Sequence, residues 1–165
     1  MEHSSAAVER GVTRRTHGAA ETRALGRALG RIAPPGRVVA LTGPLGAGKT
    51  QLAKGVAQGL EVETVVNSPT FVLMNEHEGR LRLFHIDAYR LDDPEEALAA
   101  GLFDERQAAG MTVIEWADRL AGWLPAERLD IRISRVADDD RARLLVLEPH
   151  GADHAQLAAS LRGAP

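Results

Sequence analysis

The sequence predicts an α/β fold, with a mixed β-sheet of parallel core strands and antiparallel hairpins and with helices on both faces. Three observations predict this fold. A short apolar run at residues 37–42 precedes a glycine-rich turn and a helical pattern, which is the strand–loop–helix unit of a parallel sheet. A second compact apolar run, at residues 111–115, has the length of a buried strand. Residues 71–86 and 129–147 each contain two short strand-like runs separated by turn residues, which is typical of hairpins.

The chain is long enough for one domain with a substantial core. Its 165 residues are 44% hydrophobic and 26% charged, with a net charge of −3, which is the balance of a globular protein. Residues 1–15 are polar and aperiodic and predict a disordered lead-in, so we expect a single domain over residues 16–165. The chain has no cysteines, which excludes disulfides and thiolate metal sites. No apolar run reaches membrane-spanning length, and we expect a cytoplasmic protein without a membrane partner.

Local signals place the elements in order. Apolar residues recur at helical spacing over residues 19–32, and a Pro-Pro-Gly sequence ends that helix. The strand at residues 37–42 follows, and the helix after the glycine-rich turn closes near Gly59. The remaining predicted elements are strands at 71–76 and 81–86, helices from about 92 to 100 and from about 102 to 108, a buried strand at 111–115, a short helix at 118–122, strands at 129–133 and 144–147, and a terminal helix at 151–162.

The glycine-rich turn carries a specific chemistry. Residues 43–50, GPLGAGKT, fit the pattern G-x-x-x-x-G-K-[ST] of the P-loop, in which backbone N–H groups surround a phosphate. The motif places Lys49 near the β and γ phosphates, and the Thr50 hydroxyl can ligate Mg²⁺. Only Lys49 and Lys54 are lysines in a chain that otherwise uses arginine. The alternative is a strand-to-helix turn that binds nothing.

The predicted nucleotide contacts from this segment are Gly43, Leu45, Gly46, Ala47, Gly48, Lys49, Thr50 and Gln51. Residues 1–60 carry an excess of basic residues, as expected around a polyphosphate site. The same excess could contact RNA or could be a solvated helix face.

Two acids at strand ends are candidates to complete the site. Asp87 ends the apolar run 81–86, and Glu115 ends the run 111–114. A P-loop needs a carboxylate to hold Mg²⁺ directly or through water, so we predict Asp87 and Glu115 as metal-binding residues and, with Lys49, as catalytic residues. Taken singly, each acid could instead be a strand-end cap or a surface acid.

Other side chains near these acids could link the nucleotide to a partner. Trp116 follows Glu115 directly, and we expect it at the rim of the site. Ser68 and Thr70, in the loop before the first hairpin, could sense the γ-phosphate or could form a plain turn. Tyr89 is the fourth member of this predicted switch group. His85 could act as a base or could simply be a buried, hydrogen-bonded histidine.

Taken together, these segments resemble the TsaE family, the ATPases of bacterial tRNA threonylcarbamoyladenosine (t6A) synthesis. The matching stretches are ETRALG at residues 21–26, the P-loop at 43–50, NSPTF at 67–71, HIDAYRL at 85–91 and VIEWADR at 113–119. They span about residues 16 to 150. The family commonly has an acid after the first P-loop glycine, where this chain has Pro44.

The resemblance implies ATP, ADP and Mg²⁺ as cofactors, with Glu115 as the direct Mg²⁺ ligand and Asp87 as an acid nearby. It also implies that His17, Ala19 and Arg141 lie near the nucleotide. A protein of this kind would not transfer the carbamoyl group itself. It would act on a TsaB–TsaD complex, which modifies adenosine 37 of tRNA, and would meet tRNA only through that complex.

Two other functions stay open on the sequence. A small-molecule kinase would use the same P-loop but needs an arginine-rich lid, for which Arg90 and Arg106 are the only loosely suitable pair. A nucleotide-gated binding module would keep the P-loop without useful catalysis. A GTPase is disfavoured because the chain has no N/T-K-x-D motif for reading guanine.

Overall fold

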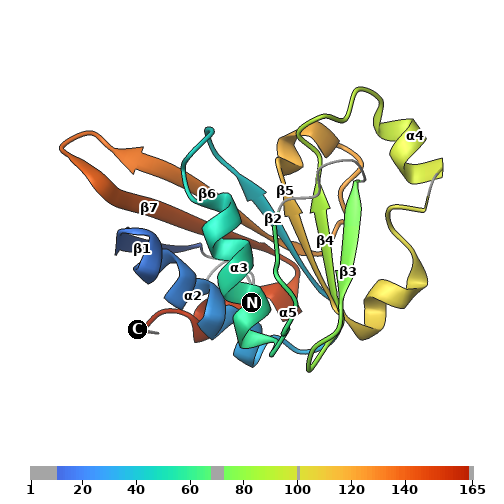
Figure 1. The fold of residues 1–165 in the computed structure, drawn as a ribbon, viewed down its shortest axis with the longest axis horizontal. Helices are drawn as coiled ribbons and strands as arrows, with labels where there is room; N and C mark the ends of the chain where they lie inside the picture. Colours follow the sequence, from blue (N-terminus) through green and yellow to red (C-terminus); the bar gives the residue numbers. More distant parts are fainter. Residues whose placement is uncertain (1–10, 68–72, 100, 164–165) are drawn as a thin grey trace, which may run out of the picture.

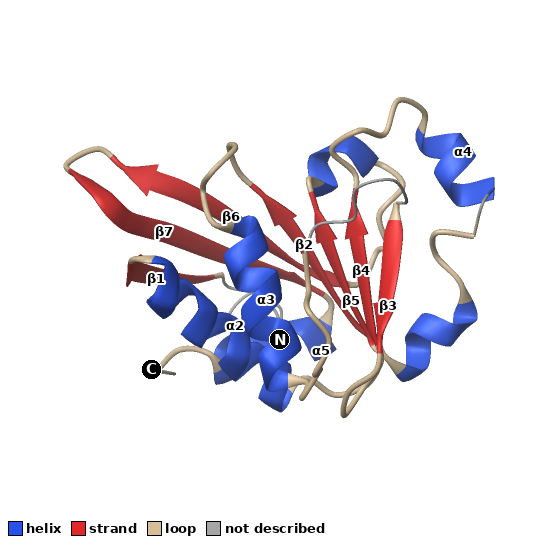
Figure 2. Cartoon of the chain, viewed as in Figure 1, coloured by secondary structure: helices blue, strands red, loops and turns tan. Residues whose placement is uncertain are grey.

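The computed structural model describes residues 11–67, 73–99 and 101–163. These residues form one seven-stranded sheet with the strand order β1-β7-β6-β2-β5-β4-β3 (Figure 1 and Figure 2). The strands are β1 (Val12–His17), β2 (Arg37–Thr42), β3 (Met74–His77), β4 (Leu83–Asp87), β5 (Met111–Glu115), β6 (Arg128–Val136) and β7 (Asp139–His150). The helices are α2 (Ala19–Ile32), α3 (Lys49–Gly59), α4 (Pro94–Ala99) and α5 (Ala152–Ser160), with 3₁₀ turns η1 (Glu105–Ala109) and η2 (Ala117–Leu120).

The sheet is mixed, as predicted. Its centre is parallel: β2 pairs with β5 and with β6, and β4 pairs with β5. Its edges are antiparallel, because β3 returns on β4 while β7 pairs with both β6 and β1. Parallel strands carry their carboxyl ends to the same edge of a sheet, so the loops after β2, β4 and β5 meet there.

The core has two layers, one on each face of the sheet. Val39 and Leu41 of β2 face the layer that α2, α3 and α5 cover, in one buried cluster with residues of β4 to β7. Ala40 of the same strand faces the other layer and packs with Ile114 and with Leu120 of η2. Alternate residues of a strand point to opposite faces, so the unbroken apolar run of β2 is explained by burial on both sides. α-Helices therefore cover one face of the sheet, whereas the 3₁₀ turn η2 and the loops beside it cover the other.

Four glycines fix how closely α2 and α3 pack. They are Gly26 and Gly30 of α2 with Gly55 and Gly59 of α3, and a Cβ added at any of them would lie 2.1 to 2.3 Å from a carbonyl oxygen of the other helix. The two backbones therefore touch without intervening side chains. This contact holds α3, which begins in the P-loop, against α2, whose first turn lies beside the same loop.

Several element bounds were predicted correctly and others were not; the predicted strands at 129–133 and 144–147, for example, are parts of the longer β6 and β7. The helix at 19–32, the strands at 37–42 and 111–115, and the helix end at Gly59 are confirmed. The disordered lead-in is wrong for residues 12–15, which belong to β1 and pair with β7. The helices expected at 102–108 and 118–122 are single 3₁₀ turns, η1 and η2. Every helix in the described part of the chain is too short or too polar to span a lipid bilayer.

Candidate phosphate-binding site

The P-loop has the backbone shape that its sequence predicts. Gly43, Gly46 and Gly48 have φ angles of 145°, 78° and 116°, a region that side chains rarely allow. A Cβ at position 43 would also lie 2.3 Å from the carbonyl oxygen of Ile133, so the loop presses on β6 at this point. The helix α3 starts at Lys49 with no side-chain cap from the described residues, which leaves its first N–H groups directed at the loop. This arrangement suits a bound phosphate.

Lys49 lies folded across the loop. Its ammonium donates hydrogen bonds to the carbonyl oxygens of Gly43 (2.6 Å) and Pro44 (2.8 Å) and sits 4.0 Å from the centre of the Trp116 ring. Burial lowers the pKa of Lys49, and the carboxylates of Glu115, Asp118 and Asp87 oppose that shift. Neutral carbonyl oxygens and the face of an aromatic ring thus hold the ammonium. Charged phosphate oxygens would be stronger partners for it than these groups are.

Glu115 is the centre of a buried hydrogen-bonded chain. Its side chain is 2% exposed. One carboxylate oxygen, Oε1, accepts from the Thr50 hydroxyl at 2.8 Å, and the other, Oε2, lies 2.6 Å from His85 Nε2. A hydroxyl and a carboxylate that converge from α3 and β5 are oxygen ligands of the kind that Mg²⁺ takes alongside phosphate and water. The described residues hold no group of three or more His, Cys, Asp or Glu that could bind a metal, so any ion here would need non-protein ligands as well.

Asp87 lies next to Glu115 across the strand pair. The two residues are register partners at the ends of β4 and β5. Asp87 Oδ1 accepts from the backbone N–H of Tyr89 at 2.9 Å, which fixes the turn after β4. Tyr89 in turn packs on Trp116, with ring centres 4.8 Å apart. Trp116 itself has a φ of 56°, a strained conformation for a bulky residue, so the chain turns sharply just after Glu115.

Two hollows flank the P-loop. The larger, of about 350 Å³, is lined by the predicted catalytic and switch side chains; these residues are Leu45, Gly46, Gly48, Lys49, Thr50, Gln51, Asp87, Tyr89, Glu115 and Trp116. The smaller, of about 100 Å³, lies where the loop meets α2 and β7; its lining is Gly18, Ala19, Thr22, Gly46, Ala47, Gly48, Gln51, Arg141 and Arg143. A nucleotide could therefore reach both sides of the loop at Gly46, Gly48 and Gln51.

The structure brings most of the predicted site residues together. Ala19 and Arg141, which the resemblance implied to lie near a nucleotide, line the smaller hollow. His17 lines neither hollow, and its backbone N–H and ring both contact Glu21. Ser68 and Thr70 lie outside the described residues, so their predicted switch role has no structural description.

Two arginines that the sequence reasoning missed also touch the loop. Arg143 of β7 donates to the carbonyl oxygen of Ala47 (3.0 Å), and Arg135 of β6 donates to that of Leu45 (2.9 Å). Both come from the C-terminal hairpin, about ninety or more residues along the chain from the motif, and no local signal marks them. They add positive charge beside the loop.

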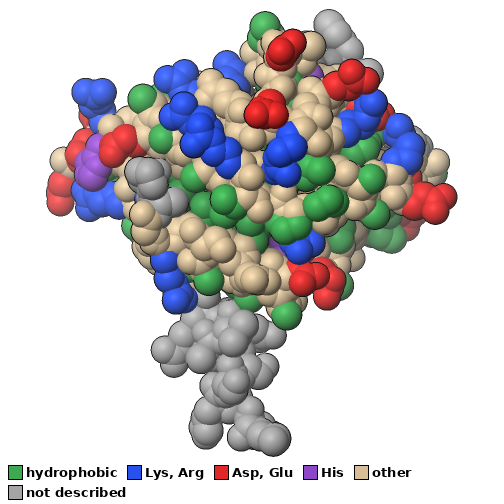
Figure 3. All heavy atoms as spheres, turned by 90° about the horizontal axis from the view of Figure 1, so that it is seen from below, with side chains coloured by type: hydrophobic (Ala, Val, Ile, Leu, Met, Phe, Trp, Pro, Cys, Tyr) green, Lys and Arg blue, Asp and Glu red, His purple; other side chains and the backbone are tan. Residues whose placement is uncertain are grey.

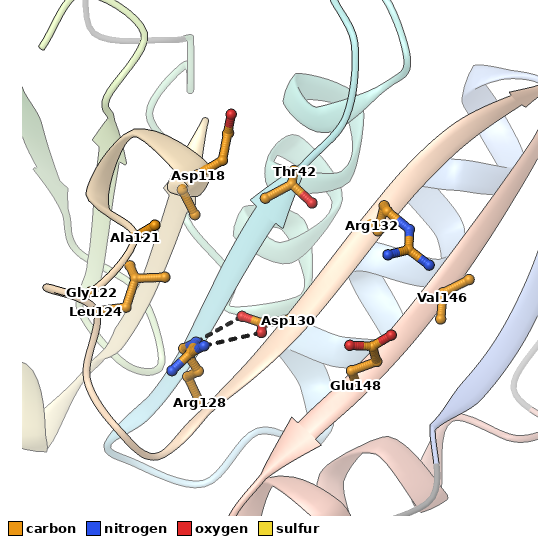
Figure 4. A pocket seen from close by; sticks show the side chains of 11 residues that line it. Thr42, Asp118, Ala121, Gly122, Leu124, Arg128, Asp130, Arg132, Val146 and Glu148 are labelled. Carbon is orange, nitrogen blue, oxygen red and sulfur yellow. Dashed lines mark hydrogen bonds and ion pairs between the residues drawn. The ribbon is translucent and has the colours of Figure 1, made fainter.

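A further hollow, of about 430 Å³, lies on β6, β7 and the turn after η2, next to Thr42 at the end of the strand that leads into the P-loop (Figure 4). Its lining includes none of the predicted site residues that the structure describes. Arg128 in it binds both oxygens of Asp130 (2.8 and 3.3 Å), and Asp130 also contacts His150 (2.8 Å). The face seen in Figure 3 likewise carries basic and acidic side chains side by side. Arg128 and Asp130 thus neutralise each other, and no residue of the P-loop motif lines this hollow.

A P-loop sequence with its helix, a strand-end carboxylate bound to the loop threonine, and parallel central strands together define a protein with a P-loop NTPase-like fold. The comparisons make this specific. The family model described as threonylcarbamoyl adenosine biosynthesis protein TsaE matches residues 16–143. The chain belongs to the TsaE family, which functions in t6A biosynthesis.

Individual relatives agree with this assignment. The tRNA threonylcarbamoyladenosine biosynthesis protein TsaE of Bacillus subtilis is 44% identical over 128 residues, which cover 77% of this chain and 80% of the relative. The TsaE protein of Treponema pallidum is 40% identical and is matched over 91% of its length. The crystal structure of Bacillus subtilis YdiB superposes with a TM-score of 0.76 at 33% identity, over 92% of this chain and 94% of the other. The P-loop NTPase-like fold is therefore confirmed.

Proposed function

We propose that this protein is a Mg²⁺-dependent ATPase that supports t6A formation at adenosine 37 of tRNA by acting on a TsaB–TsaD complex, and that it does not transfer the carbamoyl group itself. The observation that carries the proposal is the hydrogen bond of 2.8 Å between Thr50 and Glu115 beside the P-loop lysine. It joins the two oxygen groups that a P-loop ATPase uses for its metal. Family membership supports the t6A pathway as the setting.

Each side chain has a distinct role in this proposal. The loop N–H groups and Lys49 bind the phosphates, and Lys49 exchanges the carbonyl oxygens that it now contacts for phosphate oxygens. Thr50 and Glu115 would hold Mg²⁺, which would neutralise charge on the β and γ phosphates. Asp87, one strand away, accepts a proton from, or orients, the attacking water. Arg141 and Arg143 contact the rest of the nucleotide from the smaller hollow.

We expect slow turnover by the isolated protein. Among the described residues, no arginine lines the larger hollow, so a charge that stabilises the transition state has to come from elsewhere. Tyr89, stacked on Trp116 at the outer edge of the hollow, is 44% exposed and is a contact through which a partner could sense the nucleotide. Fast hydrolysis by the purified protein, unchanged by added TsaB–TsaD, would contradict this part.

The kinase alternative required Arg90 and Arg106 as a lid, and contacts elsewhere engage Arg106. Arg106 is bound by both carboxylate oxygens of Glu76, at 3.1 and 3.0 Å, and by Asp104 at 3.3 Å, and it lines neither hollow. These contacts raise the pKa of Arg106, and they place its charge away from the P-loop. Transfer of labelled phosphate to a small acceptor, rather than its release, would still favour a kinase.

The decisive experiment separates binding from turnover. Asp87→Asn should leave the affinity for ADP within about threefold of wild type and should lower phosphate release by about 100-fold or more, the usual worth of a general base. Asp92→Asn, a neighbouring exposed acid, is the matched control and should change neither. Lys49→Ala should weaken nucleotide binding whichever function is right. Unchanged phosphate release by Asp87→Asn would show that Asp87 is not the general base. Nucleotide binding without phosphate release by the wild-type protein, with or without its partners, would leave the binding-module alternative.

The partner is tested separately. A TsaB–TsaD complex immobilised on resin should retain the protein in the presence of ATP and Mg²⁺ more strongly than with nucleotide omitted. Retention that does not depend on the nucleotide, or no retention, would contradict the proposed action on that complex.

A further inference from the structure

His85 is an ionisable side chain in an apolar core. It lies in the middle of β4, opposite Val113 of β5, and its side chain is 0% exposed. Its strand neighbours two residues apart, Leu83 and Asp87, share its face, and Leu83 packs into the apolar cluster under α3. A leucine would fill such a place at less cost, because a buried polar side chain must find a hydrogen-bond partner. The partner that His85 finds is Glu115.

The two oxygens of Glu115 have separate partners. Oε2 lies 2.6 Å from His85 Nε2, inside the core, while Oε1 lies 2.8 Å from the Thr50 hydroxyl, on the side of the P-loop. The last torsion of a glutamate is soft and nearly two-fold, so packing alone would leave the carboxylate free to turn. A hydrogen bond to one oxygen removes that freedom and presents the other to the loop.

We propose that His85 is a positioning residue that orients the Glu115 carboxylate for Mg²⁺ binding. The inference rests on the metal site of the proposed function. His85 Nδ1 is buried and has no hydrogen-bond partner among the described residues, so the proton belongs on Nε2, which donates it to Glu115.

This geometry also decides between the roles that the sequence left open for His85. Nε2 is occupied by Glu115, and the full burial of the ring keeps Nδ1 away from any attacking water. His85 therefore acts through Glu115 and does not serve as the base. Groups that orient metal ligands in this way typically change metal affinity by about 10- to 100-fold when they are removed.

The test compares two amides. His85→Gln can place its side-chain N–H close to the position of Nε2, whereas His85→Asn is too short to reach Glu115. Mn²⁺ binding to the ADP complex, measured by electron paramagnetic resonance, should weaken by about 10- to 100-fold in His85→Asn and by less than about threefold in His85→Gln. Affinity for ADP in EDTA should stay at the wild-type value in both variants. His85→Leu, which keeps the bulk without the donor, should behave like His85→Asn.

The control removes a different buried polar group from the same part of the sheet. Thr112→Val of β5 loses a buried hydroxyl that has no partner among the described residues, and it should leave Mn²⁺ binding unchanged. Wild-type Mn²⁺ affinity in a folded His85→Asn variant would overturn the positioning role. If wild-type protein bound ADP but no Mn²⁺ with it, the metal site itself, and with it the proposed function, would fail instead.

Discussion

The glycine contact between α2 and α3 sets two physical effects against each other in the variant Gly55→Ala. Alanine favours a helix over glycine by about 1 kcal/mol, which would stabilise the protein. The new Cβ, however, would lie 2.1 Å from the carbonyl oxygen of Arg23, against a practical limit of 3.0 Å. The helices must therefore separate by roughly 0.9 Å. Overpacking of this kind costs about 1–3 kcal/mol of stability, and the looser packing between the separated helices increases that cost.

The steric cost should therefore exceed the gain in helix preference. We expect Gly55→Ala to lower the free energy of unfolding by about 1–2 kcal/mol and Tm by roughly 2–8 °C, measured by urea and thermal unfolding. The exposed position 58 of the same helix supplies the control, since Gln58→Ala minus Gln58→Gly gives the helix preference alone. A Gly55→Ala protein more stable than wild type would refute the close packing. A displaced α3 should also weaken nucleotide binding, because Lys49 and Thr50 lie in its first turn.

Three more outcomes are expected. Gly43→Ala should abolish measurable nucleotide binding in a titration, because its Cβ would meet the carbonyl oxygen of Ile133 at 2.3 Å and its φ of 145° disfavours a side chain. Burial lowers the pKa of His154 to about 4, so stability should be full above about pH 6.5 and should fall by up to about 3 kcal/mol as pH drops toward 4; His154→Gln should flatten that part of a urea-unfolding profile. With Trp123→Phe, ADP should change the fluorescence of the remaining Trp116, whose ring the P-loop lysine contacts at 4.0 Å, and with Trp116→Phe it should not.

The parts of the fold that local signals control could be predicted from the sequence. Apolar spacing and a Pro-Pro-Gly stop gave α2 its bounds, and the unbroken apolar runs gave β2 and β5. The edge strand β1 could not be predicted, because only Val12 and Thr16 in it are buried and its pairing partner lies more than a hundred residues away in β7. An edge strand needs little apolar pattern of its own when a long neighbour supplies the ladder.

The site residues likewise fall into those that the sequence could predict and those that it could not. Lys49, Thr50 and Glu115 could be predicted because a motif and a strand end each mark them. Arg135 and Arg143 of the C-terminal hairpin could not, since only the tertiary fold brings them to the loop. Side chains two residues apart on a strand share a face, so His85 and Asp87 lie on the same side, but nothing in the sequence indicates that the His85 ring reaches the buried oxygen of Glu115.

The pairing of β4 with β5 has a consequence for insertions and deletions. Asp87 stands opposite Glu115 because Leu83 stands opposite Met111, and side chains alternate between faces along a strand. Deleting one residue within β4 would turn Asp87 away from Glu115 even if the strand stayed paired. An added residue at Gly101, where nothing lies within 4 Å of a Cβ, should be tolerated, because a surface loop can lengthen at little cost. Tolerance to changes in chain length should therefore drop sharply at Leu83, and a scan of single-residue deletions would locate the site without any ligand.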